Sequence, residues 1–185
     1  EEKIPFWIKN SGKGWVTAEY GMLPRSTNAR IDREATKGKQ SGRTQEIQRL
    51  IGRSLRSVVD LESLGERQIK VDCDVIQADG GTRTASISGG FVALHQAVSQ
   101  LKKNYNINKP IIKEFLGAVS AGIINNQASL DLDYKEDANA QVDANFVICE
   151  SGKISEIQVT GEEYFFSDDQ FNKLFELSKK VLLKL

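Results

Sequence analysis

The stretch QIKVDCDVIQADGGTRTAS, residues 68–86, joins a strand pattern to a helix pattern through a glycine-rich turn. Apolar and polar residues alternate over 68–76, which is typical of a half-buried strand. Gly80 and Gly81 follow, and helical periodicity begins near Arg83. Glycines let a backbone approach a ligand closely, and a helix N-terminus favours negative charge. The stretch therefore predicts an anion site between a strand and a helix.

Hydrophobic periodicity on either side of this stretch predicts the remaining elements. We expect a strand over 14–21, a helix from Thr44 as N-cap to about residue 65, and a helix over 83–103. Residues 116–161 indicate an antiparallel meander with turns at INNQA and ESGK, and a helix opened by Ser167 and Asp168 closes the chain over 168–185. The sequence thus predicts one mixed α+β domain over residues 1–185, with helices packed against a largely antiparallel sheet.

The composition excludes several classes of protein. The 185 residues carry 25 basic and 25 acidic side chains, so no global field points to a nucleic acid or a membrane, and any such partner needs a local patch. No window resembles a signal peptide or a membrane span. Cys73 and Cys149 lie in strand patterns without CxxC spacing, which favours buried, reduced thiols in a cytoplasmic protein.

Two predicted helix starts carry an arginine. Arg43 directly precedes the first predicted helix, and Thr82, Arg83 and Thr84 open the second. Both guanidinium groups would join the helix N–H groups in holding an anion. The alternative is a solvated arginine beside an ordinary tight turn. The pattern is not a nucleotide P-loop, because no GxxxxGK[ST] is present.

An acidic segment lies between two predicted strands. Its five carboxylates within 13 residues are Asp131, Asp133, Glu136, Asp137 and Asp143. Such a cluster suits Mg²⁺, which takes one or two carboxylates and completes its shell with water and substrate phosphate. The alternative is a solvated strand edge, where charges deter edge pairing. Asp143 lies at the start of an apolar strand pattern, so it and Asp137 are the acids that we interpret as functional.

The segment between residues 22 and 43 is a long basic loop with a possible helical turn near Asp32. It offers phosphate contacts but no interleaved aromatic residues, so it would grip a nucleic-acid backbone without reading bases. The alternative is simple solvation of a charged loop. Its basic residues are Arg25, Arg30, Arg33, Lys37, Lys39 and Arg43. The lone His95 is interpreted as a structural histidine, and no zinc spacing or Ser/His/Asp arrangement is present.

These patterns together indicate phosphoryl transfer on a nucleic acid. Four blocks also resemble the ribonuclease PH family of phosphate-dependent 3′-to-5′ exoribonucleases: GWVTAEYGMLPRSTNAR, REATKGKQSGRTQEIQRLIGRSLRSVVD, VDCDVIQADGGTRTASISG and DLDYKEDANAQVDANFV. The resemblance spans nearly the whole chain. It implies a ribosomal-protein-S5-domain-2-like fold, a homo-hexameric ring built as a trimer of dimers, inorganic phosphate as co-substrate and trimming of tRNA 3′ ends.

The resemblance also implies roles for particular residues. Arg43 and Arg83 fall on the phosphate-binding arginines, and Asp137 and Asp143 on the catalytic or metal-binding aspartates. The phosphate would be surrounded by Gly81, Thr82, Thr84 and Ser86, and RNA would be gripped by Arg25, Arg30 and Arg33. Either aspartate could hold Mg²⁺ or act as general acid.

Two departures from the family accompany the resemblance. Family members have an upstream segment that supplies opening strands of the sheet, whereas this chain begins Glu-Glu-Lys, so we expect such a segment to be missing here. Residues 158–163 read QVTGEE where the family usually reads QGTAEG. Two other functions stay open: a non-catalytic RNA-binding ring subunit, which would not need both arginines and both aspartates, and a small-molecule phosphotransferase, which would not need the basic loop.

Overall fold

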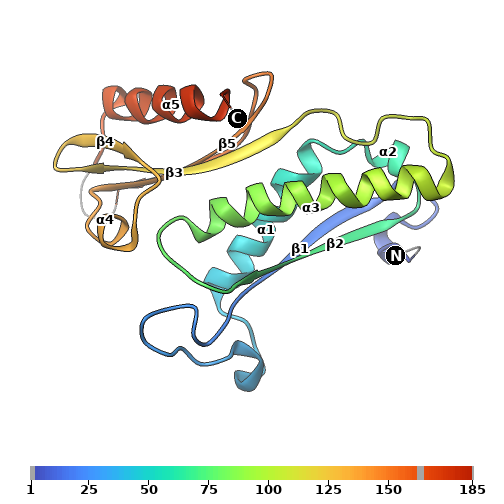
Figure 1. Cartoon of the computed structure of the whole chain (residues 1–185), viewed down its shortest axis with the longest axis horizontal. Helices are drawn as coiled ribbons and strands as arrows, with labels where there is room; N and C mark the ends of the chain where they lie inside the picture. Colours follow the sequence, from blue (N-terminus) through green and yellow to red (C-terminus); the bar gives the residue numbers. More distant parts are fainter. Residues whose placement is uncertain (1–2, 162–164, 185) are drawn as a thin grey trace. The chain divides into compact units, whose positions relative to one another are not determined.

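The computed structural model describes residues 3–161 and 165–184 and divides into two units. The first unit contains residues 1–77 and 89–115, and the second contains residues 78–88 and 116–185 (Figure 1). Helix α3 (Thr82–Tyr105) contributes its first seven residues to the second unit and the others to the first. The mixed α+β class is confirmed, while the single domain over residues 1–185 stays a prediction.

The first unit is built around two parallel strands. Strand β1 (Trp15–Met22) pairs with β2 (Gln68–Val75), in register from Trp15 opposite Gln68 to Met22 opposite Val75. Both strands lie where the alternation predicts them. Between them the chain forms the basic loop with its short 3₁₀ turn η2 (Glu34–Lys37), then helix α1 (Gly42–Ser57) and helix α2 (Leu61–Leu64). A further 3₁₀ turn, η1 (Phe6–Ile8), precedes β1.

Helix α1 begins and ends earlier than the sequence predicts. Ser41, not Thr44, is the N-cap, because its hydroxyl accepts a hydrogen bond from the Thr44 N–H at 3.1 Å. The helix ends at Ser57, and Asp60 starts α2 by accepting bonds from two N–H groups of that short helix. The predicted apolar stripe is nonetheless confirmed as buried: Ile47, Leu50, Ile51, Leu55, Val58 and Val59.

The second unit contains a four-stranded antiparallel sheet. Its strands are β3 (Leu116–Ile124), β4 (Gln127–Leu130), β5 (Val142–Cys149) and β6 (Ile154–Gly161), in the order β4-β3-β5-β6. The expected meander is wrong in order, because β5 pairs with β3 and not with β4. The chain also forms a short helix between β4 and β5, α4 (Tyr134–Ala138), which the sequence interpretation missed.

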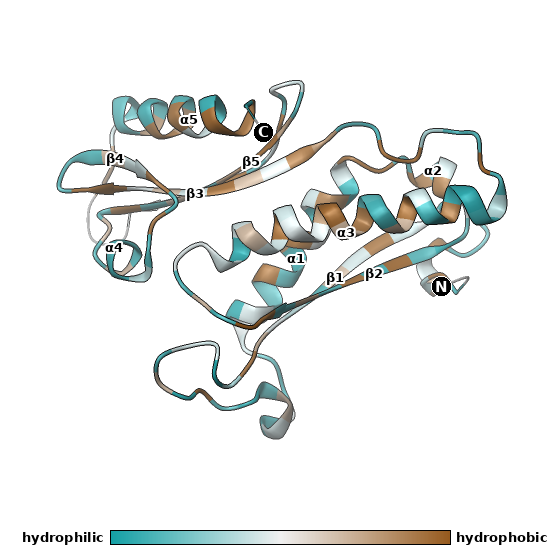
Figure 2. Ribbon diagram, in the orientation of Figure 1, coloured by the Kyte–Doolittle hydropathy of each residue, from teal (hydrophilic) through white to brown (hydrophobic). Residues whose placement is uncertain are grey.

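Helix α5 (Asp168–Leu182) covers the apolar face of this sheet. Ser167 caps it in a capping box with Gln170, as the sequence predicts for Ser167. Its Leu174 and Leu182 join a core of β3 and β5 residues around Phe146, and β3 is largely hydrophobic in Figure 2. Val181, predicted to face inward, is 39% exposed because Leu182 occupies the inner position. Glu162 and Glu163 of the QVTGEE block lie outside the described residues.

Both cysteines are free thiols, as predicted. Cys149 is buried and Cys73 is partly buried, and burial, followed by the nearby Asp72 and Asp74, raises the pKa of the Cys73 thiol. Within residues 3–161 and 165–184, no helix combines the length and the apolar character needed to cross a membrane.

Candidate functional site

One face of the four-stranded sheet is polar. The register aligns Ser120, Asn145 and Gln158 in one row across β3, β5 and β6, and places Gly122, Asp143 and Thr160 in the next row on the same face. The opposite face carries the apolar core beneath α5. Asp143 therefore belongs to a polar surface, as its position beside the apolar residues of β5 predicts.

The glycine-rich turn packs on this polar face. Gly81 has a φ of +70°, which favours glycine, and a Cβ there would lie 2.9 Å from Ser120 Oγ. A Cβ at Gly80 would collide with the backbone of Leu132. Both positions require glycine because the turn lies so close to Ser120 and Leu132 that a side chain would not fit. The start of α3 is thus held directly against β3 and the β4–α4 connection.

Asp79 fixes the turn to helix α4. Its Oδ1 accepts hydrogen bonds from the Gly80 N–H at 2.9 Å and from the Tyr134 N–H at 2.6 Å. The sequence interpretation did not single out Asp79, although an aspartate directly before two glycines is a frequent turn residue. We assign Asp79 a positioning role, because it accepts both of these hydrogen bonds from backbone N–H groups.

Arg83 reaches from the start of α3 to the sheet. Its guanidinium donates a hydrogen bond to Gln158 Oε1 at 2.8 Å, and Gln158 stands opposite Asn145 in the polar row. Asn145 in turn donates to Asp143 Oδ1 at 3.5 Å, the limit of a hydrogen bond. The structure thus brings Arg83 and Asp143, two of the predicted site residues, onto one side of the same sheet.

The other predicted phosphate-binding residues of this unit lie on α3 or directly before it. The Gly81 carbonyl accepts the first helical bond, from the Ala85 N–H at 3.0 Å, so Thr82, Arg83 and Thr84 form the first turn of α3, where the helix dipole favours an anion. Thr84 is buried, and its hydroxyl donates to the Gly81 carbonyl at 2.9 Å, which stabilises the turn. Thr82 and Ser86 are partly exposed.

Ser120 adds a buried hydroxyl beside the turn. It is 3% exposed, and its Oγ makes no hydrogen bond to the described residues. A buried polar atom without a protein partner is costly unless a solvent molecule or ligand satisfies it. No pattern in the sequence identifies Ser120, because only the pairing of β3 with β5 and the close approach of Gly81 place it here.

Asp137 lies on α4, over the same face. Leu132 and Ala140 flank this helix in sequence, and both would contact a Cβ at Gly122, the β3 partner of Asp143. The Asp137 carboxylate is partly exposed and makes no hydrogen bond or ion pair to the described residues. The other acids serve the fold: Asp133 and Glu136 form the capping box of α4, and Asp131 adopts a left-handed turn conformation.

A divalent metal site is consistent with this donor set. Within the described residues no three His, Cys, Asp or Glu side chains gather as a metal cage. Mg²⁺ does not need such a cage, since one or two carboxylates with water and substrate phosphate suffice. Asp137 and Asp143 are partly exposed carboxylates over the polar face, so they fit the Mg²⁺ ion that the sequence predicts.

Arg43 lies in the first turn of α1, not before the helix. Its guanidinium is exposed and makes no ion pair to the described residues. The carboxylate of Glu34 already occupies this helix start, accepting bonds from the Ser41 N–H at 3.2 Å and the Thr44 hydroxyl at 2.8 Å. Hydrogen bonds from Ser41 and then Thr44 hold the pKa of Glu34 below its ordinary value. An anion at this helix start would therefore interact with the Arg43 guanidinium, because Glu34 already lies at the N-terminus of α1.

The basic loop folds over a hollow of about 690 Å³ in the first unit. Arg33 and Arg43 both line it, together with Lys37 and Lys39. Arg33 is exposed and makes no ion pair to the described residues, and the same holds for Arg25, which does not line the hollow. Arg30 differs, because its guanidinium lies 3.2 Å from Asp32.

Comparison with known proteins identifies the family. Residues 1–100 match the 3′ exoribonuclease family, domain 1, and residues 114–181 match the 3′ exoribonuclease family, domain 2. Together these matches cover most of the chain. The chain belongs to this family. The match to domain 1 ends at residue 100, within α3, and the match to domain 2 begins at residue 114, whereas the second structural unit also includes residues 78–88.

Relatives in this family share the whole chain. Ribonuclease PH of Mesorhizobium japonicum is 59% identical over 187 residues, covering 100% of this chain and 78% of its own length. Ribonuclease PH of Rhodospirillum rubrum is 58% identical over 185 residues, covering 100% of this chain and 77% of its own length. The family resemblance expected from the four sequence blocks is confirmed.

Solved structures share the fold at low identity. The crystal structure of rice Rrp46 matches with a TM-score of 0.72 at 16% identity, over 98% of this chain and 72% of that one. An Archaeoglobus fulgidus exosome with RNA bound to the active site matches with a TM-score of 0.74 at 16% identity, over the same two shares. This family fold is the mixed α+β fold that the sequence predicts.

Proposed function

We propose that this chain is a phosphate-dependent 3′-to-5′ exoribonuclease that trims the 3′ ends of tRNA precursors and releases nucleoside diphosphates. One observation carries the proposal. This chain is 59% identical to a ribonuclease PH. In it, Arg83 extends from the start of α3, directly after the glycine-rich turn, over a sheet face that also bears Asp143. This arrangement supplies donors for one phosphate and a carboxylate for the chemistry beside it.

Inorganic phosphate is the nucleophile in the reaction. One of its oxygens attacks the phosphorus of the terminal phosphodiester, a new P–O bond forms, and the bond to the 3′ oxygen of the preceding nucleotide breaks. The released nucleotide therefore carries two phosphates. Two anions must approach each other in this step, so the Arg83 guanidinium, the first N–H groups of α3 and the Arg43 guanidinium would lower their repulsion and stabilise charge in the transition state.

The leaving 3′ oxygen needs stabilisation and a proton. Asp137 and Asp143 are the residues proposed for this side of the reaction, with one acting as general acid if it is protonated. They are also the residues that would hold Mg²⁺, which supplies electrostatic stabilisation to a departing oxygen when bound. The Gln158 amide oxygen orients Arg83, and Asp79 keeps the turn in place.

RNA binding is assigned to the basic loop. Arg25, Arg30 and Arg33 would contact phosphates of the RNA backbone. Because Arg33 and Arg43 line one hollow, the loop can deliver a strand toward the residue proposed to bind the attacking phosphate. Contacts of this kind fix the register of the strand but do not read its sequence.

The assembly and location follow from the family resemblance. We propose a homo-hexamer built as a trimer of dimers, acting in the cytoplasm. Free thiols at Cys73 and Cys149 support a reducing compartment. The adjacent Phe6 and Trp7, 84% and 62% exposed, support burial against another subunit.

The decisive experiment uses a tRNA with extra 3′ nucleotides. The protein is incubated with this RNA and Mg²⁺, with and without inorganic phosphate, and the products are separated by chromatography. We expect nucleoside diphosphates only when phosphate is present. Release of nucleoside monophosphates, or release independent of phosphate, contradicts the proposal.

Two aspartate variants separate catalysis from binding. Asp143→Asn and Asp137→Asn keep the side-chain shape and remove the charge, so we expect phosphorolysis to fall while RNA binding persists. Asp169→Asn, on the exposed first turn of α5, is the matched control and should keep full activity. Full activity in both Asp137→Asn and Asp143→Asn would overturn their assigned role, and RNA binding without turnover in the unmodified chain would favour the non-catalytic ring subunit.

A further inference from the structure

The glycine-rich turn and helix α4 carry the two halves of the proposed reaction site. The turn leads into the first residues of α3, to which the attacking phosphate is assigned, and α4 carries Asp137, which is assigned to the leaving oxygen. Both segments belong to the second structural unit. The contacts between them therefore bear on how the two halves of the site act together.

Helix α4 depends on contacts at its ends. It has five residues, and an isolated helix shorter than about 12–15 residues is marginal in water. None of its residues is buried, whereas Leu132 and Ala140, which flank it, are 2% and 7% exposed. The position of the Asp137 carboxylate is therefore set by what holds the two ends of this helix.

Asp79 joins the start of α4 to the glycine-rich turn. Its Oδ1 accepts hydrogen bonds from the Gly80 N–H at 2.9 Å and from the Tyr134 N–H at 2.6 Å, and Tyr134 is the first residue of α4. In the part of the chain that the structure describes, the other hydrogen bonds of α4 stay within residues 133–140. One carboxylate oxygen thus holds a backbone N–H group from each segment.

The two segments also touch directly at Gly80. A Cβ there would collide with the Leu132 carbonyl and would lie 3.0 Å from the carbonyl carbon of Asp133, the N-cap of α4. No side chain therefore separates the turn from the N-cap. A movement of the turn is passed to the start of α4 by this contact and by the two hydrogen bonds of Asp79.

We propose that Asp79 couples the two halves of the site: phosphate bound at the start of α3 favours the docked position of α4 and thereby places the Asp137 carboxylate. The inference rests on the proposed function, which assigns phosphate to α3 and the leaving oxygen to Asp137. Its two states are α4 docked on the turn and α4 released by a local opening. Because coupling between two binding sites is reciprocal, a cation bound at Asp137 raises the affinity for phosphate by the same factor.

Hydrogen exchange of the α4 amides tests the coupling in the absence of RNA, so that turnover plays no part. Exchange is followed by mass spectrometry on a peptide that contains α4, with and without inorganic phosphate, and calorimetry measures phosphate binding in parallel. We expect phosphate to slow this exchange about fivefold or more in the unmodified chain and to have little effect in Asp79→Ala. Asp79→Asn keeps an acceptor oxygen but loses the charge, so an intermediate effect is expected.

Cation binding gives a second measurement. Mn²⁺ is a paramagnetic probe for the site proposed for Mg²⁺, and electron paramagnetic resonance measures the free ion. Saturating phosphate should tighten Mn²⁺ binding about five- to tenfold in the unmodified chain and by a smaller factor in Asp79→Ala. A direct bond between phosphate and the cation does not depend on Asp79, so an equal factor in both chains would overturn the inference.

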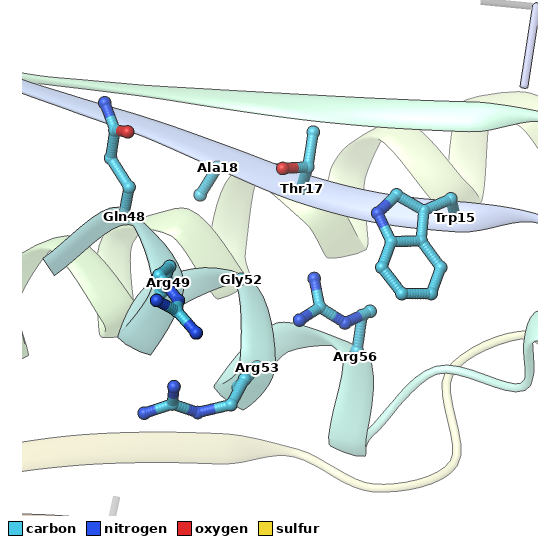
Figure 3. Close-up of a pocket in the computed structure, with 8 residues that line it drawn as sticks. All are labelled: Trp15, Thr17, Ala18, Gln48, Arg49, Gly52, Arg53 and Arg56. Atoms are coloured by element: carbon cyan, nitrogen blue, oxygen red, sulfur yellow. The ribbon is translucent and has the colours of Figure 1, made fainter. Parts of the chain in front are cut away.

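Two variants in the first unit are the matched controls. Asp60→Ala removes a carboxylate that, like Asp79, accepts hydrogen bonds from two backbone N–H groups, at 3.0 and 3.1 Å. Gln48 lines a groove of about 340 Å³ between α1 and β1 (Figure 3), and Gln48→Ala removes its hydrogen bond to the Tyr20 carbonyl at 3.4 Å. Both variants should keep the full effect of phosphate on α4 exchange, and its loss in either one would contradict a specific role for Asp79.

The outcomes separate this coupling from the proposed reaction. If phosphate binds to the unmodified chain but leaves α4 exchange unchanged, or slows it equally in Asp79→Ala, the coupling is wrong and the phosphate assignment stands. If phosphate does not bind to the unmodified chain, both are wrong. Thermal unfolding verifies that each variant is folded. Should Asp79→Ala unfold, an effect in Asp79→Asn equal to that in the unmodified chain would overturn the coupling.

Discussion

Arg83 donates its hydrogen bond to Gln158, a residue 75 positions further along the chain. This contact explains how a guanidinium at a helix start is held over the polar face of the sheet. A free arginine would lose side-chain entropy on binding phosphate, whereas one oriented by Gln158 has lost part of it already. We therefore propose that Gln158 positions Arg83 for phosphate and does not itself bind phosphate.

Replacing Arg83 tests this division of roles. We expect Arg83→Ala to raise the apparent KM for phosphate about ten- to a hundredfold, because a hydrogen bond to a charged group contributes about 1.5–3 kcal/mol. Gln158→Ala should raise it by a smaller factor. Steady-state rates across a phosphate titration measure both effects. RNA affinity, measured without phosphate, should change little, and its loss in Arg83→Ala would contradict the assignment.

The basic loop allows a comparison between two arginines of equal charge. Arg30 is paired with Asp32 at 3.2 Å, whereas Arg33 makes no ion pair to the described residues and lines the hollow with Arg43. We expect Arg33→Ala to weaken RNA binding and reduce the salt slope by about one unit, and Arg30→Ala to have a smaller effect. Binding isotherms at several salt concentrations make the comparison. A larger loss of RNA affinity in Arg30→Ala than in Arg33→Ala would show that the ion pair with Asp32 does not reduce the contribution of Arg30 to RNA binding.

At the scale of elements, the start of α1 couples the basic loop to the helix. Glu34 of the loop accepts bonds from Ser41 and Thr44 at the helix start. The loop is thereby fixed at its C-terminal end, next to Arg43. A carboxylate near a helix N-terminus also interacts favourably with the helix dipole, so the contact stabilises both elements.

This coupling predicts a pH-dependent stability. We expect Ser41→Ala to lower the free energy of unfolding by about 1 kcal/mol at neutral pH through loss of the N-cap. Because the pKa of Glu34 is lowered in the folded state, its stabilisation is present above the unfolded carboxyl pKa of about 4.3 and is lost as pH falls through the folded value. The destabilisation should therefore shrink in acid. Urea unfolding at neutral and acidic pH measures it.

A serine without such contacts provides the control for that measurement. Ser99, in the middle of α3, makes no side-chain hydrogen bond to the described residues. We expect Ser99→Ala to change the stability little at either pH. If Ser41→Ala cost the same free energy in acid as at neutral pH, the coupling between Ser41 and Glu34 would be wrong.

Helix α4 shows why one element escaped prediction. It has five residues, too few for a hydrophobic period to be visible, and its capping box uses Asp133 and Glu136. In sequence these acids are indistinguishable from Asp137, because a capping carboxylate and a metal-binding carboxylate are the same side chain. The two roles are distinguished only in the structure, where Asp133 and Glu136 accept hydrogen bonds from backbone N–H groups of the helix start.

At the scale of the whole molecule, the proposed ring can be measured directly. We expect light scattering on the purified chain to give six times the 20.6 kDa chain mass. In the proposed ring, exposed aromatic residues such as Phe6 and Trp7 would give an apolar contribution to assembly. A species with the mass of a single chain, across the concentrations used for activity, would contradict the hexamer for this chain.

Much of the fold was predictable because it depends on local periodicity. The strands at 15–22 and 68–75, the helix at 82–105 and the buried stripe of α1 follow from alternation and from the 3.6-residue repeat. Strand order was not predictable in the same way. The pairing of β3 with β5 skips β4 and α4, and no local pattern specifies which edge a strand will use.

By itself the sequence determined the family and predicted the chemical character and the charged residues of the candidate site, since these depend on side-chain type and short-range spacing. Only the tertiary structure decided which residues cooperate. It placed Gln158 against Arg83, Asp79 against Tyr134, and three arginines of α1 beside Trp15. The physical reason is that hydrogen bonds and grooves form between residues distant in the chain, and their partners are fixed by strand register and helix packing rather than by local pattern.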